Sequence, residues 1–86
     1  MRYAVESDTP DNGRSTYSEC FGPNGRRGRV LEESDNLAVA IQAAAGFSPE
    51  GMPSRDYWIY DRRACRIVTK TEIKAAGGRV TTQYPS

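Results

Sequence analysis

Alternating apolar and polar residues predict strands in the first third of the chain. The pattern covers residues 2–7, returns at about residues 15–21, and returns again at about residues 29–32. Residues 8–13 and 22–25 separate these segments, and each contains an Asn-Gly pair that accepts the backbone angles of a tight turn. We therefore expect a meander of three strands, in which the second and third form a hairpin.

The clearest single element is a helix that ends at about Ala45. The two residues before it, Ser34 and Asp35, carry side-chain oxygens that can cap the backbone N–H groups of its first turn. Gly46 can adopt the left-handed conformation that closes many helices. That ending would allow Phe47 to pack back on the helix.

The two faces of this helix differ from those of an ordinary surface helix. At about 100° per residue, the face expected to enter the core carries Leu37, Ile41, Ala44 and Ala45. The opposite face carries Val39 and Ala43 with Gln42, and no charged residue occurs between Asn36 and Glu50. A surface helix normally has a charged side. This helix is therefore either covered on both faces or offers Val39 and Ala43 to another molecule.

The second half of the chain is predicted to add a hairpin after a proline-rich loop. Residues 48–54 contain two prolines and a glycine, which exclude a regular strand or helix. Residues 57–60 and 65–68 are strand-like, and Asp61 occupies a favoured opening position for the turn that joins them. A second antiparallel hairpin is therefore expected here.

A short second helix and a final strand complete the predicted fold. Thr69 and Glu72 have the spacing of a capping box, which indicates a helix that ends at residues 77–78. Residues 79–83 can then form a last strand. The prediction is an α+β fold in the order βββ-α-ββ-α-β, with the long helix packed on one face of an antiparallel sheet. Residues 1–86 are expected to form a single small domain.

The composition excludes most familiar catalytic and metal-binding chemistry. The chain contains no histidine, which is the commonest general base and metal ligand. Cys20 and Cys65 cannot supply a four-ligand zinc site, and they lack the histidine that usually activates a thiolate. We expect both to be free and half-buried, with a disulfide as the alternative. The sequence predicts no catalytic residue, no metal, no cofactor and no enzymatic activity.

No apolar segment suggests a signal peptide or a membrane span. A span needs roughly 20 apolar residues, and no run of the chain approaches that length. We therefore expect a cytoplasmic protein with no membrane partner, in a reducing environment where the two thiols stay free.

Aromatic and basic residues gather in the second half of the chain. The candidate contact residues are Tyr57, Trp58, Tyr60, Arg62, Arg63 and Arg66. Such residues dominate many protein interfaces, and they also bind single-stranded nucleic acid across surfaces such as residues 55–79. The formal net charge of only +1 favours a protein partner. A simpler interpretation is that two aromatic rings fill the core while the arginines surround it.

A glycine-rich segment at residues 22–29 supplies three further arginines. Arg26, Arg27 and Arg29 are candidate phosphate contacts, since guanidinium groups and glycine-rich backbone both suit phosphate oxygens. The segment lacks the ending of a P-loop and is expected to join two strands. A hairpin tip with solvated arginines is therefore the favoured interpretation.

The layout resembles that of small accessory proteins of bacteriophages and mobile elements, anti-CRISPR inhibitors among them. The likeness lies in a meander, an alanine-rich helix at residues 35–46 and a following hairpin at residues 57–68. No motif is shared, so no functional residue is carried over. The resemblance implies a protein that docks on a host complex and blocks its nucleic-acid surface or its recruitment of a nuclease.

The leading hypothesis from the sequence is a non-enzymatic protein-binding module. Its expected partner is a host defence or nucleic-acid-processing complex, such as a CRISPR effector. Direct nucleic-acid binding is the alternative, and a homodimer through the uncharged helix face remains open.

Overall fold

The computed structural model describes residues 1–8, 16–22, 25 and 27–85. Its elements in chain order are β1 (Tyr3–Ser7), β2 (Thr16–Phe21), β3 (Arg27–Ser34), α1 (Leu37–Phe47), β4 (Trp58–Asp61), β5 (Arg66–Ile67) and α2 (Lys70–Ala75). The strands form one antiparallel sheet in the order β2-β3-β1-β4-β5. The predicted α+β class, the β2–β3 hairpin and the β4–β5 hairpin are confirmed. The predicted meander of the first three strands is wrong, because β1 pairs with β3 and β4 rather than with β2. The predicted turn at residues 8–13 lies mostly outside the described residues.

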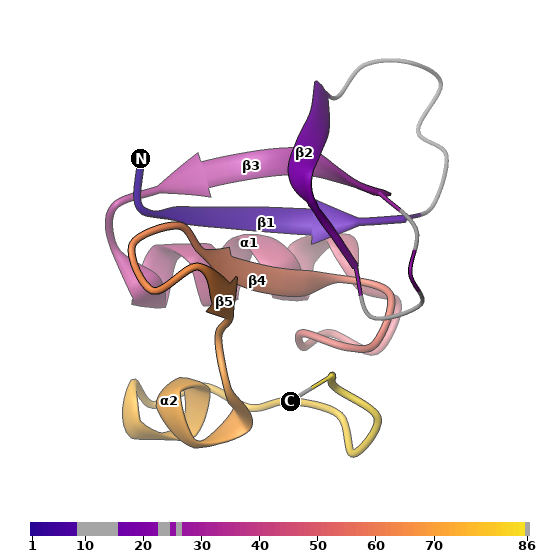
Figure 1. The fold of residues 1–86 in the computed structure, drawn as a ribbon. Coiled ribbons are helices and arrows are strands. Elements are labelled where there is room, and N and C mark those ends of the chain that lie inside the picture. Colours follow the sequence, from indigo (N-terminus) through magenta and orange to yellow (C-terminus); the bar gives the residue numbers. More distant parts are fainter. Residues whose placement is uncertain (9–15, 23–24, 26, 86) are drawn as a thin grey trace.

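The sheet is curled, so its two faces are covered by different elements. Helix α1 lies along one face, and β2 crosses the opposite face (Figure 1). The central strand β1 is buried along its whole length. The buried apolar cluster comprises Tyr3, Val5, Ala40, Ile41, Ala44, Trp58, Ile59, Val68, Ile73 and Tyr84. A thin core is thus closed from both sides.

The prediction of a final strand at residues 79–83 is wrong. This segment forms no strand, and it is tied to the loop after α1 by a backbone hydrogen bond from the N–H of Thr81 to the carbonyl of Pro53, at 3.1 Å. Tyr84 then enters the core, where its hydroxyl oxygen accepts the N–H of Ile59 at 3.2 Å. The segment is therefore held against the rest of the fold by the buried ring of Tyr84 rather than by pairing with a strand.

Helix α1 begins and ends differently from the sequence expectation. The side chain of Asn36, not that of Ser34 or Asp35, accepts the N–H groups of the first turn. Gly46 has no positive φ and lies inside the helix. The helix continues to Phe47, and the next residue is extended because it precedes a proline, which disfavours helical backbone. Phe47 is 43% exposed and does not fold back into the core.

Helix α2 confirms the sequence signals at both of its ends. The hydroxyl of Thr69 accepts the N–H of Glu72 at 3.1 Å, as in a capping box. Gly77 has a φ of 83°, and the N–H of Gly78 reaches the carbonyl of Ile73 at 2.9 Å. This glycine ending is a Schellman motif.

Candidate interaction surfaces

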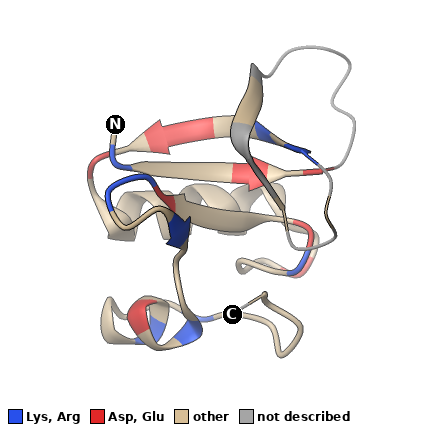
Figure 2. Cartoon of the chain, in the orientation of Figure 1, with Lys and Arg blue, Asp and Glu red and all other residues tan. Residues whose placement is uncertain are grey.

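Three of the predicted contact residues form a basic corner at the β4–β5 turn. Arg62, Arg63 and Arg66 are all exposed there, and we call them the arginine corner. The carboxylate of Asp61 shapes the turn by accepting the N–H groups of Arg63 and Ala64, at 3.0 and 3.2 Å. The local sequence therefore positions these arginines as predicted, close to the N-terminus of the chain (Figure 2).

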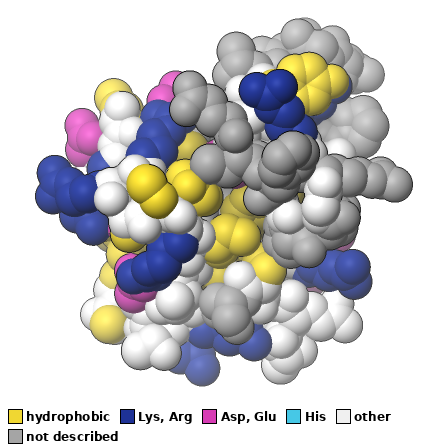
Figure 3. Space-filling view, in the orientation of Figure 1, with side chains coloured by type: hydrophobic (Ala, Val, Ile, Leu, Met, Phe, Trp, Pro, Cys, Tyr) yellow, Lys and Arg dark blue, Asp and Glu magenta, His cyan; other side chains and the backbone are white. Residues whose placement is uncertain are grey.

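Ion pairs neutralise most of the arginine corner. Arg62 pairs with Glu33, and Arg66 pairs with Glu72. Each guanidinium lowers the pKa of its carboxylate, chiefly through the hydrogen bond between them. Figure 3 shows basic and acidic side chains next to one another over this part of the surface. Of the three arginines, only Arg63 has no ion pair with a described residue.

A fourth arginine is fixed beside the corner by a buried acid. The guanidinium of Arg2 donates to both carboxylate oxygens of Asp61, at 3.1 and 3.0 Å. This bond is the largest cause that lowers the pKa of Asp61, whose side chain is 1% exposed. The pair anchors the start of β1 to the end of β4, so its role is structural.

The three predicted aromatic contacts are not gathered on one surface. Trp58 is 1% exposed and belongs to the core, so it is unable to act as a contact residue. Tyr57 and Tyr60 are half-buried; the first precedes β4 and the second lies near its far end. Among the predicted aromatic contacts, Trp58 is therefore corrected to a core residue, and Tyr57 and Tyr60 stay predictions. The interpretation that places aromatic rings in the core holds for Trp58.

Trp58 contacts a buried acid that the sequence did not indicate. Its indole N–H donates to Oε1 of Glu6 at 3.2 Å, and the hydroxyl of Ser18 donates to Oε2 at 2.7 Å. Burial raises the pKa of Glu6, and these hydrogen bonds oppose the rise. The backbone of Gly28 closes the site, since a Cβ there would stand 3.0 Å from the indole ring. Glu6 is 1% exposed, and the residues around it join neighbouring strands.

A tyrosine flanked by two arginines is exposed on the β2–β3 hairpin. Tyr17 is 57% exposed, and the guanidinium of Arg29 lies 4.6 Å from the centre of its ring. Arg29 also donates to the Tyr17 hydroxyl at 2.9 Å. Arg27 lies 5.8 Å from the ring centre and donates to the carbonyl of Ser18 at 2.6 Å. The third candidate phosphate contact, Arg26, lies outside the described residues.

The outer face of α1 is open and uncharged. Val39 is 50% exposed and Phe47 is 43% exposed, and neither is covered by another described element. Ala38, Gln42 and Gly46 are exposed between them. The structure thus decides between the two sequence alternatives in favour of an uncovered patch. It differs at Ala43, which is half-buried and packs against the core.

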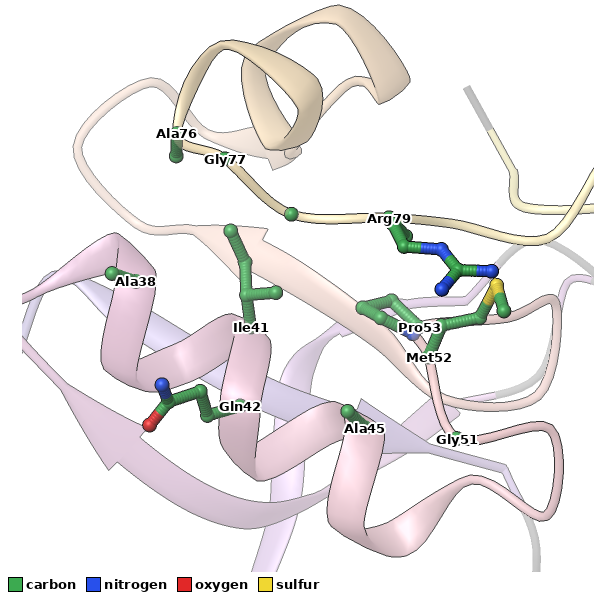
Figure 4. A pocket seen from close by; sticks show the side chains of 11 residues that line it. Ala38, Ile41, Gln42, Ala45, Gly51, Met52, Pro53, Ala76, Gly77 and Arg79 are labelled. Atoms are coloured by element: carbon green, nitrogen blue, oxygen red, sulfur yellow. The ribbon is translucent and has the colours of Figure 1, made fainter.

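A shallow groove of about 240 Å³ runs beside this face (Figure 4). One wall is α1, and the others are residues 51–53 and residues 76–79 after α2. Gly78 lets residues 76–79 lie close to α1, because a Cβ at Gly78 would stand 2.9 Å from Ile41. Figure 4 shows the side chain of Ile41 pointing from α1 toward Ala76 and Gly77, and Arg79 along the rim.

The described residues contain neither a cluster of metal ligands nor a helix that could span a membrane. No three thiols or carboxylates among them come together as metal ligands would. Neither described helix has the length and hydrophobicity that crossing a bilayer requires. Cys65 is free and exposed rather than half-buried, with a φ of 56°. The side chain of Cys20 lies outside the described residues.

No protein-family model matches the chain, and comparisons with curated proteins and with solved structures find no match. Functional inference therefore rests on the surfaces described above.

Proposed function

We propose that this protein is a protein-binding module that docks through the uncharged face of α1. The contact residues on this face are Ala38, Val39, Gln42, Gly46 and Phe47. The observation that carries the proposal is the exposure of Val39 and Phe47 on a helix with no charged residue along its length. A free surface helix normally turns charged side chains to water, and an apolar patch is stabilised when a partner covers it.

The arginine corner is a less favourable contact surface than the face of α1. Arg62 and Arg66 already hold carboxylates of the same chain. A partner must displace those carboxylates before it gains either arginine, and exposed ion pairs stabilise by at most about 1 kcal/mol. The face of α1 has no such internal competitor. We therefore place the contact on α1 and not at the arginine corner.

The class of partner follows from the resemblance to phage accessory proteins. Such proteins act without catalysis on host defence or nucleic-acid-processing complexes. We propose that the module inhibits a complex of this kind by covering one of its surfaces. Support comes from the lack of histidine and from the small rigid fold that presents α1.

The test is affinity capture of host proteins with matched variants. Val39→Glu places a charge in the middle of the proposed contact, at a position exposed enough to keep the fold. Arg63→Gln removes a charge from the arginine corner and serves as the control. We expect a defined complex to bind the wild type and Arg63→Gln but to be lost with Val39→Glu. Equal capture by all three proteins, or capture of none, contradicts the proposal.

Tyr17 and its two arginines favour nucleic-acid binding as the second candidate. An exposed ring can stack on a base while neighbouring guanidinium groups meet phosphates. The arginines already flank the ring, so the geometry needed for such a contact is partly formed. Electrophoretic shift of a single-stranded oligonucleotide at about 50 mM and about 200 mM salt tests this function. A shift lost with Tyr17→Ala and at high salt supports it, whereas no shift at low salt excludes it.

A further inference from the structure

The groove beside α1 is lined mainly by apolar and small residues, together with the amide of Gln42 and the cation of Arg79 at its rim. Ala38, Ala45 and Gly77 have little or no side chain, and this hollows the groove. Among the described lining residues, Arg79 is the only ionisable one. The volume of about 240 Å³ lies below the roughly 300 Å³ at which small-molecule pockets usually begin. The space suits one or two side chains of a partner better than a cofactor.

Arg79 is available for a partner. Its side chain is exposed, and its guanidinium has no hydrogen bond or ion pair with any residue that the structure describes. Figure 4 shows the side chain extending along the rim toward Met52 and Pro53. A guanidinium is the donor that best fits a carboxylate, through two parallel hydrogen bonds. An apolar hollow beside such a donor suits a ligand in which an apolar group stands next to an anionic one.

We propose that the groove receives a segment of the partner protein in which an apolar side chain stands next to a carboxylate. The apolar side chain enters the hollow between Ala38, Ala45 and Gly77, and the carboxylate binds Arg79. This proposal rests on the proposed function, because the groove adjoins the uncharged face of α1 and extends the same contact. It adds the chemistry that the partner must carry.

A second copy of the chain fits the groove less well. The face of α1 and the groove contain no acid, so a symmetric dimer through them brings no carboxylate to either Arg79. Charge therefore favours a different protein.

The experiment compares two short peptides that differ only in charge. The probes are N-acetyl-Leu-Glu-amide and N-acetyl-Leu-Gln-amide, titrated into the full chain while backbone amide resonances are followed by NMR. We expect the acidic peptide to shift the signals of Ala45, Gly77, Gly78 and Arg79. The neutral peptide should bind about two- to fivefold more weakly, which is the effect of one exposed ion pair.

Two variants and one control assign the effect to the groove. Arg79→Gln should remove the preference for the acidic peptide, whereas Arg63→Gln, an exposed arginine elsewhere, should keep it. Ala38→Phe fills the groove from an exposed position and should abolish the shifts from both peptides. Thermal unfolding of each variant verifies that it is folded.

Four outcomes overturn the inference. If Arg79→Gln keeps the wild-type preference for the acidic peptide, Arg79 does not bind the carboxylate and the proposal is refuted. Shifts that lie outside the groove also refute it. A dimer seen in sedimentation and dissociated by Ala38→Phe replaces it with self-association. If host capture is lost with Val39→Glu but survives both groove variants, the proposed function stands and this inference fails.

Discussion

At the scale of single residues, the buried acid Glu6 should control how stability depends on pH. Its pKa is raised, chiefly by burial, so the folded state holds its proton more strongly than the unfolded state does. Stability from this group is complete below the ordinary pKa range of glutamate, near 4.3, and declines as pH rises through the higher pKa of the folded state. Glu6→Gln removes this decline while it keeps hydrogen bonds to Trp58 and Ser18.

The measurement is urea unfolding of wild type and Glu6→Gln from acid to neutral pH. We expect Glu6→Gln to gain stability relative to wild type as pH rises. Glu6→Ala is the control: it does not titrate either, but it leaves the Trp58 N–H without its acceptor, so it should be about 1–3 kcal/mol less stable than Glu6→Gln at every pH. A constant difference between wild type and Glu6→Gln across the range would show that the acid does not titrate differently on folding.

Two glycines should respond in opposite ways to the same substitution. A Cβ at Gly78 would stand 2.9 Å from methyl groups of both Ile41 and Ile73, so Gly78→Ala should cost about 1–3 kcal/mol. A Cβ at Gly46 meets nothing within 4 Å, and the residue lies inside α1. Gly46→Ala should therefore stabilise by about 0.5–1 kcal/mol. Thermal unfolding of the pair checks both signs, and a neutral Gly78→Ala would mean that α2 does not pack closely on α1.

At the scale of elements, the start of α1 should depend on Asn36 rather than on the residues before it. Asn36→Ala removes the acceptor of two N–H groups, at 2.9 and 3.3 Å, and should cost about 1 kcal/mol. Asp35→Ala is the comparison, since Asp35 accepts the N–H of Arg2 and does not cap the helix. Equal losses in urea unfolding would count against the assignment of the cap.

Elements with local signals could be predicted from the sequence, and those fixed by distant contacts could not. Thr69, Glu72 and Gly77 specify α2 through bonds within a few residues, and Asp61 specifies its turn in the same way. The segment at residues 79–83 alternates like a strand, but its course is set by the burial of Tyr84 against β4. No local pattern reveals that contact.

At the scale of the whole molecule, the difference between local signals and distant contacts explains which candidate surfaces could be predicted from the sequence. The uncharged side of α1 is visible in the sequence, because one helix presents it. Trp58 and Glu6 are different: period-two alternation places them on the face of the sheet that is free of helix. The curl of the sheet brings β2 over this face and buries both side chains. Curvature arises from the strands together, so a pattern read one strand at a time misses it.

Two carboxylates hold Arg62 and Arg66 of the arginine corner, and we expect them to weaken its attraction for nucleic acid. The double variant Glu33→Gln and Glu72→Gln removes both, and the formal net charge of +1 rises by two to +3. Glutamine serves as well as glutamate at the third position of a capping box, so α2 should persist. We expect the variant to retard a single-stranded oligonucleotide at low salt more strongly than wild type, and to lose that binding as salt rises.

Stability should change little in the double variant, because exposed ion pairs contribute at most about 1 kcal/mol each. Circular dichroism and thermal unfolding separate a change of fold from a change of charge. If the variant binds no better than wild type, ion pairing is not what restrains Arg62 and Arg66. Phosphates would then gain nothing from the freed guanidinium groups, so any contact with nucleic acid would have to come from Tyr17 and its arginines. Docking of a protein on α1 would remain the leading proposal.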